Sequence, residues 1–148
     1  MQSQELSAVL GKPDSTDAAM GKALLYWVSQ SQPLHYLVVY TEADFGSDEP
    51  VPTVKQLQVT SPQFQTTGKI STGAPLPKIR EAYSNLKPIA YYQNDARQRV
   101  YVFDEQQQGI TFEVTLPDSI CTAITIHEKG KMIKGTYLPV HPDMTVIK

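Results

Sequence analysis

The histidines and the cysteine are the side chains of this sequence whose types most often carry chemistry. His35, His127 and His141 could bind a metal ion, but their spacing matches no ligand motif. Cys121 could act as a nucleophile with His127 as its base, because a catalytic thiol needs a nearby imidazole to lower its pKa. Six positions along one strand put both side chains on one face, about 20 Å apart. We therefore expect structural histidines, a buried Cys121, and neither metal nor cofactor.

Acidic residues that could supply oxygen ligands to calcium gather in one segment, at Glu42, Asp44, Asp48 and Glu49. This segment lacks the alternating ligand positions and the final bidentate glutamate of an EF-hand loop. We expect a solvated acidic loop here.

Ser71, Thr72 and Gly73 precede a segment with helical periodicity and could cradle a phosphate on backbone N–H groups. No lysine of the Walker type accompanies them. Helix capping by Ser71 and Thr72 explains the same residues equally well.

Carboxylate and imidazole side chains of the second half could share acid and base work if the fold brings them together. The candidates are Glu113, Asp104 and His127. The sequence contains no Gly-x-Ser-x-Gly, His-Glu-x-x-His, Cys-x-x-Cys or Gly-x-Gly-x-x-Gly motif. These residues are therefore the basis of an alternative to binding, namely a hydrolase or small-ligand enzyme.

Three tyrosines are candidates for a binding surface. Tyr91, Tyr92 and Tyr101 could form an aromatic platform for a protein partner or a sugar. The alternative is that they pack within a sheet, as aromatic residues of strands usually do.

The composition is that of an ordinary globular protein. The 148 residues are 41% hydrophobic and 19% charged, and the net charge is −2. This charge gives no electrostatic footprint for nucleic acid, and no apolar run has the roughly 20 residues of a membrane span. The first ten residues, MQSQELSAVL, show no secretory signal, so either the protein is cytosolic or a leader has been removed.

Hydrophobic periodicity predicts short helices and several strands. Apolar residues recur at helical spacing in 5–10 and 76–85, and six segments have strand patterns, namely 24–28, 34–40, 54–61, 99–103, 109–114 and 121–126. In GITFEV, Ile110, Phe112 and Val114 share one face, which leaves Thr111 and Glu113 to point to water. VKQLQVTS alternates similarly, with its glutamines opposite Leu57 and Val59. The tail after Lys129 should add one or two edge segments.

The order of these elements looks duplicated. Each half reads as a helix, a Leu-(Gly)-Lys-Pro stop, two strands, a loop and a third strand. The offset between halves is 75 residues at Leu24 and Arg99 and 67 at Leu57 and Ile124, and the difference falls in a loop. We therefore expect two related units, 1–66 and 67–148, which could also form one continuous domain.

Several segments resemble known bacterial families. ELSAVLGKPDS is similar to the helix and Leu-Gly-Lys-Pro stop of the SmpA/OmlA outer-membrane lipoproteins and of β-lactamase inhibitor protein. SPQFQTTGKISTGAPLPKIREAY and the strands RVYVF, QGITFEV and AITIHEKG resemble uncharacterised bacterial extracytoplasmic proteins. The resemblance implies tandem α+β units, an envelope location, and a binding or structural role. The sequence has no lipobox cysteine.

We therefore expect an α+β fold with helices on one side of an antiparallel sheet. The expected function is non-catalytic protein binding in the bacterial cell envelope, periplasmic or secreted, through the sheet face without helices. A cytoplasmic location is the alternative. The rival function is an enzyme with a cleft between the two units.

Overall fold

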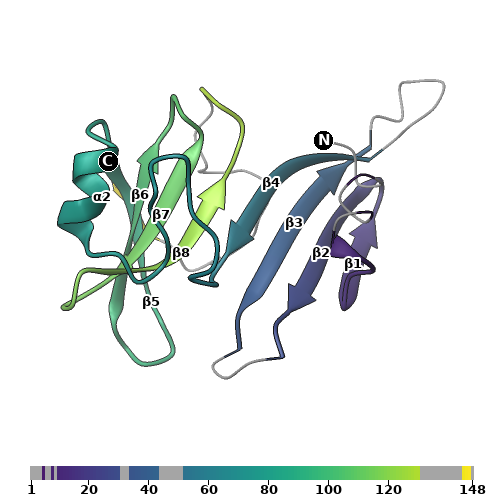
Figure 1. The fold of residues 1–148 in the computed structure, drawn as a ribbon, viewed down its shortest axis with the longest axis horizontal. Helices are drawn as coiled ribbons and strands as arrows, with labels where there is room; N and C mark the ends of the chain where they lie inside the picture. Colours follow the sequence, from purple (N-terminus) through teal and green to yellow (C-terminus); the bar gives the residue numbers. More distant parts are fainter. Residues whose placement is uncertain are drawn as a thin grey trace.

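The computed structural model describes residues 5, 8, 10–30, 34–43, 52–130 and 145–147. Within these residues the chain forms one antiparallel sheet with the strand order β1-β2-β3-β4-β8-β7-β6-β5-β9 (Figure 1). The strands are β1 (Ser15–Ala19), β2 (Lys22–Val28), β3 (Tyr36–Glu42), β4 (Thr53–Val59), β5 (Lys87–Gln93), β6 (Arg99–Glu105), β7 (Ile110–Thr115), β8 (Ile120–Ile126) and β9 (Thr145–Val146). One helix, α2 (Leu76–Ala82), lies between β4 and β5 in the chain.

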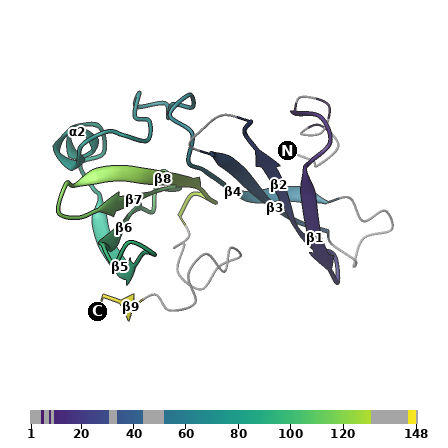
Figure 2. The same ribbon diagram turned by 90° about the horizontal axis from the view of Figure 1, so that it is seen from below.

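The expected α+β fold with helical layers is wrong, because the protein is essentially all-β. Helix α2 has only seven residues and packs on one side of the second half of the sheet (Figure 2). Of the expected helix 5–10, Glu5, Ala8 and Leu10 lie within the described residues, and they are helical. The prediction of an antiparallel sheet is confirmed.

The sheet consists of two four-stranded meanders joined edge to edge, and the two-residue strand β9 pairs with β5 at one end. Strands β1–β4 form the first and β5–β8 the second. They meet where β4 pairs with β8, through the pairs Leu57–Ile126, Gln58–Thr125 and Val59–Ile124. The internal duplication and its boundary at 66/67 stay a prediction.

The main core lies between α2 and the second meander. Ile79 and Phe112 are both 0% exposed, and Tyr83 contacts Phe112 with ring centroids 5.3 Å apart. The other buried members are Val59, Ile70, Ala74, Leu86, Phe103, Ile110, Val114, Cys121 and Ile124. Burial of each larger side chain of this kind stabilises the fold by about 1.5–3 kcal/mol. The cluster therefore holds α2 in place, although a helix this short is not stable by itself.

The Thr- and Gly-rich loop before α2 is fixed by Tyr83. The Tyr83 hydroxyl donates to Thr66 Oγ1 at 2.8 Å and accepts the backbone N–H of Gly68 at 3.2 Å. A Cβ at Gly68 would lie 2.9 Å from the same hydroxyl oxygen, so a side chain there would displace it. Glycine at 68 therefore allows the loop to close on the tyrosine.

The expected capping of α2 by Ser71 and Thr72 is wrong. The helix begins after Pro75, which makes no side-chain cap, and Pro77 occupies its first turn, where a missing N–H costs no helical hydrogen bond. Thr72 instead donates from Oγ1 to the carbonyl of Thr60 at 2.9 Å, which ties the loop to the end of β4.

The sheet face opposite α2 is polar but buried, which corrects the expectation that Thr111 and Glu113 point to water. Their exposed fractions are 1% and 5%, and Gln58 on β4 is 4% exposed. Alternation correctly separates these side chains from the apolar face, but it says nothing about what covers them. No helix within the described residues is long and apolar enough to cross a membrane.

Candidate functional site

Two of the three candidate tyrosines lie side by side. Tyr91 on β5 and Tyr101 on β6 are directly paired in the sheet, with ring centroids 5.6 Å apart. Phe103, two residues further along β6, continues the row, with its centroid 6.3 Å from that of Tyr101. Because alternate residues of a strand share a face, all three rings lie on the side of the sheet that carries α2.

Arginines lie at both ends of this row. The guanidinium of Arg99 is 4.6 Å from the Tyr91 centroid, and that of Arg80, from the last turn of α2, is 5.2 Å from the Phe103 centroid. We call Arg99, Tyr91, Tyr101, Phe103 and Arg80 the cation–aromatic row. Each exposed contact of this kind is worth about 0.5–1 kcal/mol, enough to orient a guanidinium but not to neutralise its charge.

Tyr92 does not join this row. As the next residue on β5 it points to the opposite face, where it is buried and its hydroxyl donates a short hydrogen bond to Glu113 Oε1. The three tyrosines therefore form a pair and a separate buried residue, and not a three-residue platform.

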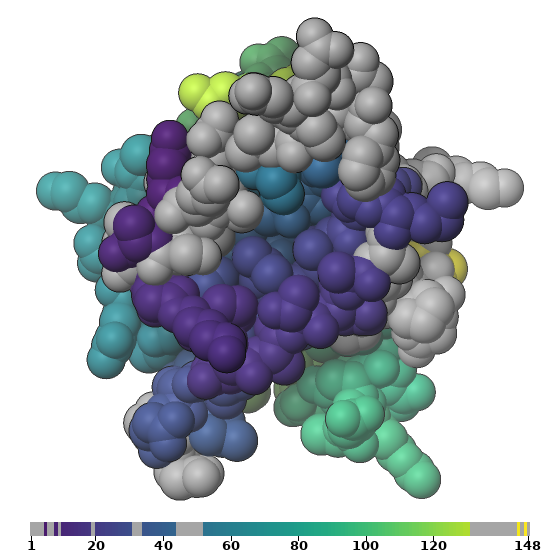
Figure 3. Space-filling model, turned by 90° about the vertical axis from the view of Figure 1, so that its right-hand side faces the viewer, coloured from purple at the N-terminus to yellow at the C-terminus, as the bar shows by residue number. Residues whose placement is uncertain are grey.

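A cleft of about 450 Å³ lies at the end of the β5–β6 hairpin, beside the row. Tyr91, Arg97 and Arg99 line it together with Tyr92, Gln93 and Thr145. The hairpin projects from the body of the molecule, at the lower right of Figure 3 in green. The sequence did not single out Arg97 and Arg99 as binding residues. The available signal was two arginines spaced two residues apart at the start of the strand RVYVF.

The turn of this hairpin holds Arg97 in a defined position. Arg97 has a φ of 63°, and its N–H donates to the carbonyl of Asn94 at 2.9 Å. The Asn94 side chain in turn accepts the N–H of Gln98 through Oδ1, also at 2.9 Å. Asparagine suits such a turn because its short side chain can bond to the backbone a few residues on.

The guanidinium groups of this surface are available for a ligand. Among the described residues, no carboxylate lies within 4.0 Å of Arg80, Arg97 or Arg99, and this includes Asp95 in the same hairpin turn. All three arginines are exposed. The arrangement can therefore offer aromatic surface and unpaired positive charge together.

The proposed acid–base residues fall into two separate groups. His127 Nε2 lies 2.8 Å from Asp104 Oδ1, and Thr111 Oγ1 donates to the same oxygen at 2.8 Å. Both Asp104 and His127 are buried, at 4% and 8% exposure. Asp104 also borders a cleft of about 690 Å³, whose lining includes Lys87.

Glu113 belongs to a different network. Its Oε2 accepts from Gln58 Nε2 at 2.5 Å, and its Oε1 from the Tyr92 hydroxyl. Gln58 Nε2 also lies 3.3 Å from Thr125 Oγ1. Glu113 therefore links β7 to β4 and β5, whereas Asp104 and His127 link β6 to the end of β8.

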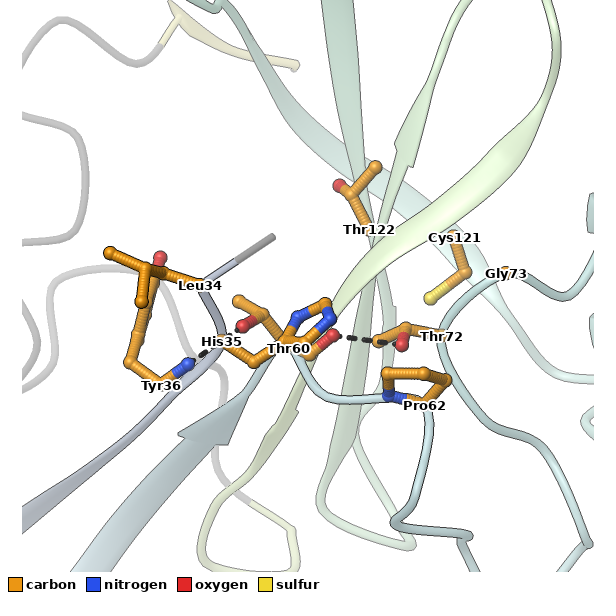
Figure 4. Close-up of a pocket in the computed structure, with 9 residues that line it drawn as sticks. All are labelled: Leu34, His35, Tyr36, Thr60, Pro62, Thr72, Gly73, Cys121 and Thr122. Carbon is orange, nitrogen blue, oxygen red and sulfur yellow. Dashed lines mark hydrogen bonds between the residues drawn. The ribbon is translucent and has the colours of Figure 1, made fainter. Parts of the chain in front are cut away.

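A third cleft, of about 400 Å³, lies where the two meanders meet (Figure 4). It is lined by His35, Cys121 and Thr72 together with Leu34, Tyr36, Thr60, Pro62, Gly73 and Thr122. None of the three proposed acid–base residues lines it. A cleft between the units thus exists, but with a different set of side chains from the one expected there.

Cys121 in this cleft is buried, as expected. Burial raises the pKa of its thiol to about 12, a backbone hydrogen bond with Ala123 opposes this shift, and the charge of Glu113 adds to it. The register shift between Glu113 and Val114 pairs Ala123 with Glu113 and Cys121 with Val114. Cys121 consequently joins the core under α2, on the face opposite to His127, which corrects the expectation of a shared face.

The remaining candidates divide between described and undescribed residues. Glu42 is half-buried and accepts from the Tyr40 hydroxyl at 3.3 Å. Asp44, Asp48, Glu49 and His141 lie outside the described residues. Within the described part, no three His, Cys, Asp or Glu side chains gather as a metal site.

Comparisons with known proteins give one distant structural likeness. No protein-family model and no curated protein matches this chain. The chain is similar to the crystal structure of a DUF4309 family protein (YjgB) from Bacillus subtilis subsp. subtilis str. 168, with 11% sequence identity and a TM-score of 0.45, over 86% of this chain and 78% of that chain. The resemblance to SmpA/OmlA lipoproteins and β-lactamase inhibitor protein stays a prediction.

Proposed function

We propose that this protein is a non-catalytic binding protein that contacts a protein partner through the cation–aromatic row and the adjoining cleft. The observation that carries the proposal is the pairing of half-buried Tyr91 and Tyr101, with the guanidinium of exposed Arg99 over the Tyr91 ring. Tyrosine and arginine are the residue types most enriched where binding energy concentrates, because they combine large contact area with directed polar groups.

The location of this surface differs from the sheet face that the sequence favours. The face without α2 is filled by buried polar side chains around Glu113 and Thr111, so its centre offers little contact area. The row lies instead on the α2 side, at the end of the sheet away from the first meander (Figure 1).

The proposal is tested by comparing variants in affinity capture. Wild-type protein, Tyr91→Ala and Tyr36→Ala are immobilised and exposed to envelope fractions of the source organism. Tyr36 is a matched control because it is a tyrosine, 41% exposed, in the first meander. We expect a partner that wild type and Tyr36→Ala retain and Tyr91→Ala loses. A partner held equally by all three would exclude the row as its binding site.

The extracytoplasmic location is part of the same proposal and rests on the sequence resemblance. It is checked by expressing the complete gene with a C-terminal epitope tag and separating periplasmic, membrane and cytoplasmic fractions. Recovery of the protein in the cytoplasmic fraction alone would refute it.

A further inference from the structure

Two arginines in the cleft at the β5–β6 hairpin point to the chemistry of the partner. We propose that this cleft binds the carboxylates of an acidic polypeptide segment, with Arg97 and Arg99 as the charged contacts and Tyr91 as the apolar one. The inference rests on the proposed function and adds the chemical class of the ligand at the same surface.

The position of Arg99 over the Tyr91 ring leaves its guanidinium without a described carboxylate partner. The guanidinium carbon lies 4.6 Å from the ring centroid, and the group carries five N–H donors in its plane. Carboxylates fit the edge of a guanidinium with two parallel hydrogen bonds, which makes arginine more selective for them than lysine. Tyr91 therefore pre-orients a carboxylate-binding group.

Charge complementarity favours an acidic partner. Arg97 and Arg99 both line the cleft, and no described carboxylate lies within 4.0 Å of either guanidinium. The contrast within the chain is Lys55, whose charge is met by Glu128 at 3.8 Å. The chain as a whole carries a net charge of −2, so these two positive charges are a local feature of the hairpin.

The length of the row favours a polypeptide segment over a single small anion. Three rings with centroid steps of 5.6 and 6.3 Å separate Arg99 from Arg80 at the far end. A small carboxylate would engage the cleft end alone, whereas an extended acidic segment can meet the cleft, the tyrosines and Arg80. Several weak contacts made by one chain then add up to a useful affinity.

The test uses a short, end-blocked peptide of alternating glutamate and glycine, titrated into 15N-labelled protein and followed by NMR. We expect shifts at the Nε–H resonances of Arg97 and Arg99 and at the backbone amide of Tyr91. Each of Arg97→Gln and Arg99→Gln should weaken binding about tenfold, because a charge-assisted hydrogen bond is lost. Lys22→Gln removes the same charge from exposed Lys22 in the first meander and should leave the affinity unchanged.

Several outcomes would overturn the inference. Among them are no binding of the glutamate peptide by wild type, equal binding of a glutamine–glycine peptide, and equal weakening by Lys22→Gln. Free glutamate that binds as tightly as the peptide would show a small-carboxylate site and would refute the polypeptide segment. If Tyr91→Ala loses the captured partner while the two arginine variants keep it, the proposed function stands and the acidic partner is wrong.

Discussion

Asp104 and His127 lie 2.8 Å apart, from Oδ1 to Nε2, although 23 residues separate them in the sequence. The contact joins β6 to the end of β8, across β7, where Thr111 donates to the same Asp104 oxygen. The second ring nitrogen of His127 lies 3.1 Å from the carbonyl oxygen of Glu128. Every polar atom of the imidazole therefore has a partner inside the protein.

Removal of either member of this pair should destabilise the fold, because the other is left buried without its contact. We expect Asp104→Ala and His127→Ala each to lower the free energy of unfolding by about 2 kcal/mol in urea titrations. The double variant should lose less than the sum of the two. Lys55→Ala is the control, because its pair with Glu128 is partly exposed and worth at most about 1 kcal/mol. Strict additivity would show that Asp104 and His127 are not coupled.

Gly109 should tolerate no side chain, for two reasons that a control separates. It has a φ of +71°, and a Cβ would lie 2.3 Å from the backbone oxygen of His127. Gly11 has a similar φ of +78° and no atom within 4 Å of such a Cβ. We expect Gly11→Ala to cost about 1 kcal/mol and Gly109→Ala about 3 kcal/mol or more in thermal unfolding. Equal costs would mean that the backbone at His127 yields without penalty.

The thiol of Cys121 should be unreactive in the folded protein. Burial raises its pKa to about 12 from an ordinary value of 9.0, so at pH 8 the nucleophilic thiolate is scarce. A chromogenic disulfide reagent should label Cys121 slowly in buffer and rapidly in urea. Rapid labelling of the native protein would contradict the buried, structural role.

The same shift has a consequence for stability. Between the unfolded and the folded pKa the unfolded chain has lost the thiol proton and the folded chain has kept it. The stabilising contribution of Cys121 to the free energy of unfolding is therefore fully present below pH 9. It declines as the pH rises toward 12. Cys121→Ala should show a smaller loss of stability over this alkaline range than wild type does.

Glu113 should influence the titration of Tyr36. Burial raises the pKa of Tyr36 above its ordinary value of 10.0, and the negative charges of Glu113 and of Tyr26 raise it further. Glu113→Gln removes one of these charges, so the pKa of Tyr36 should fall while staying elevated. The measurement is a 13C NMR titration of the tyrosine ring carbons. An unchanged Tyr36 curve would show that Glu113 exerts no field at that ring.

The hydrophobic pattern predicted six of the strands but missed two that complete the meanders. Strands β6, β7 and β3 are indicated by RVYVF, GITFEV and LHYLVVY, because apolar and β-branched residues dominate these segments. Strand β1 reads STDAA, which has no strand signal, and β5 begins with Lys87-Pro88. Their pairing partners stabilise them, and this non-local contribution is absent from a local pattern. Because β1 and β5 add two strands and α2 has only seven residues, the protein is essentially all-β and not α+β.

The site was predictable as residue types but not as geometry. Alternation along β5 already implies that Tyr91 and Tyr92 face opposite ways, whereas the pairing of Tyr91 with Tyr101 needs the register of β5 on β6. The positions of Arg99 and Arg80 over their aromatic rings depend on that register and on where α2 packs. The burial of Glu113 is likewise a tertiary property, since a polar residue opposite an apolar face normally meets water.

Through the three residue pairs between β4 and β8, each meander covers a free strand edge of the other. A polypeptide cut in the loop after β4 and separated into its two parts would present two rows of unsatisfied backbone N–H and C=O groups. Such fragments should self-associate or recombine with each other, and mixing them offers a route to a split version of this protein.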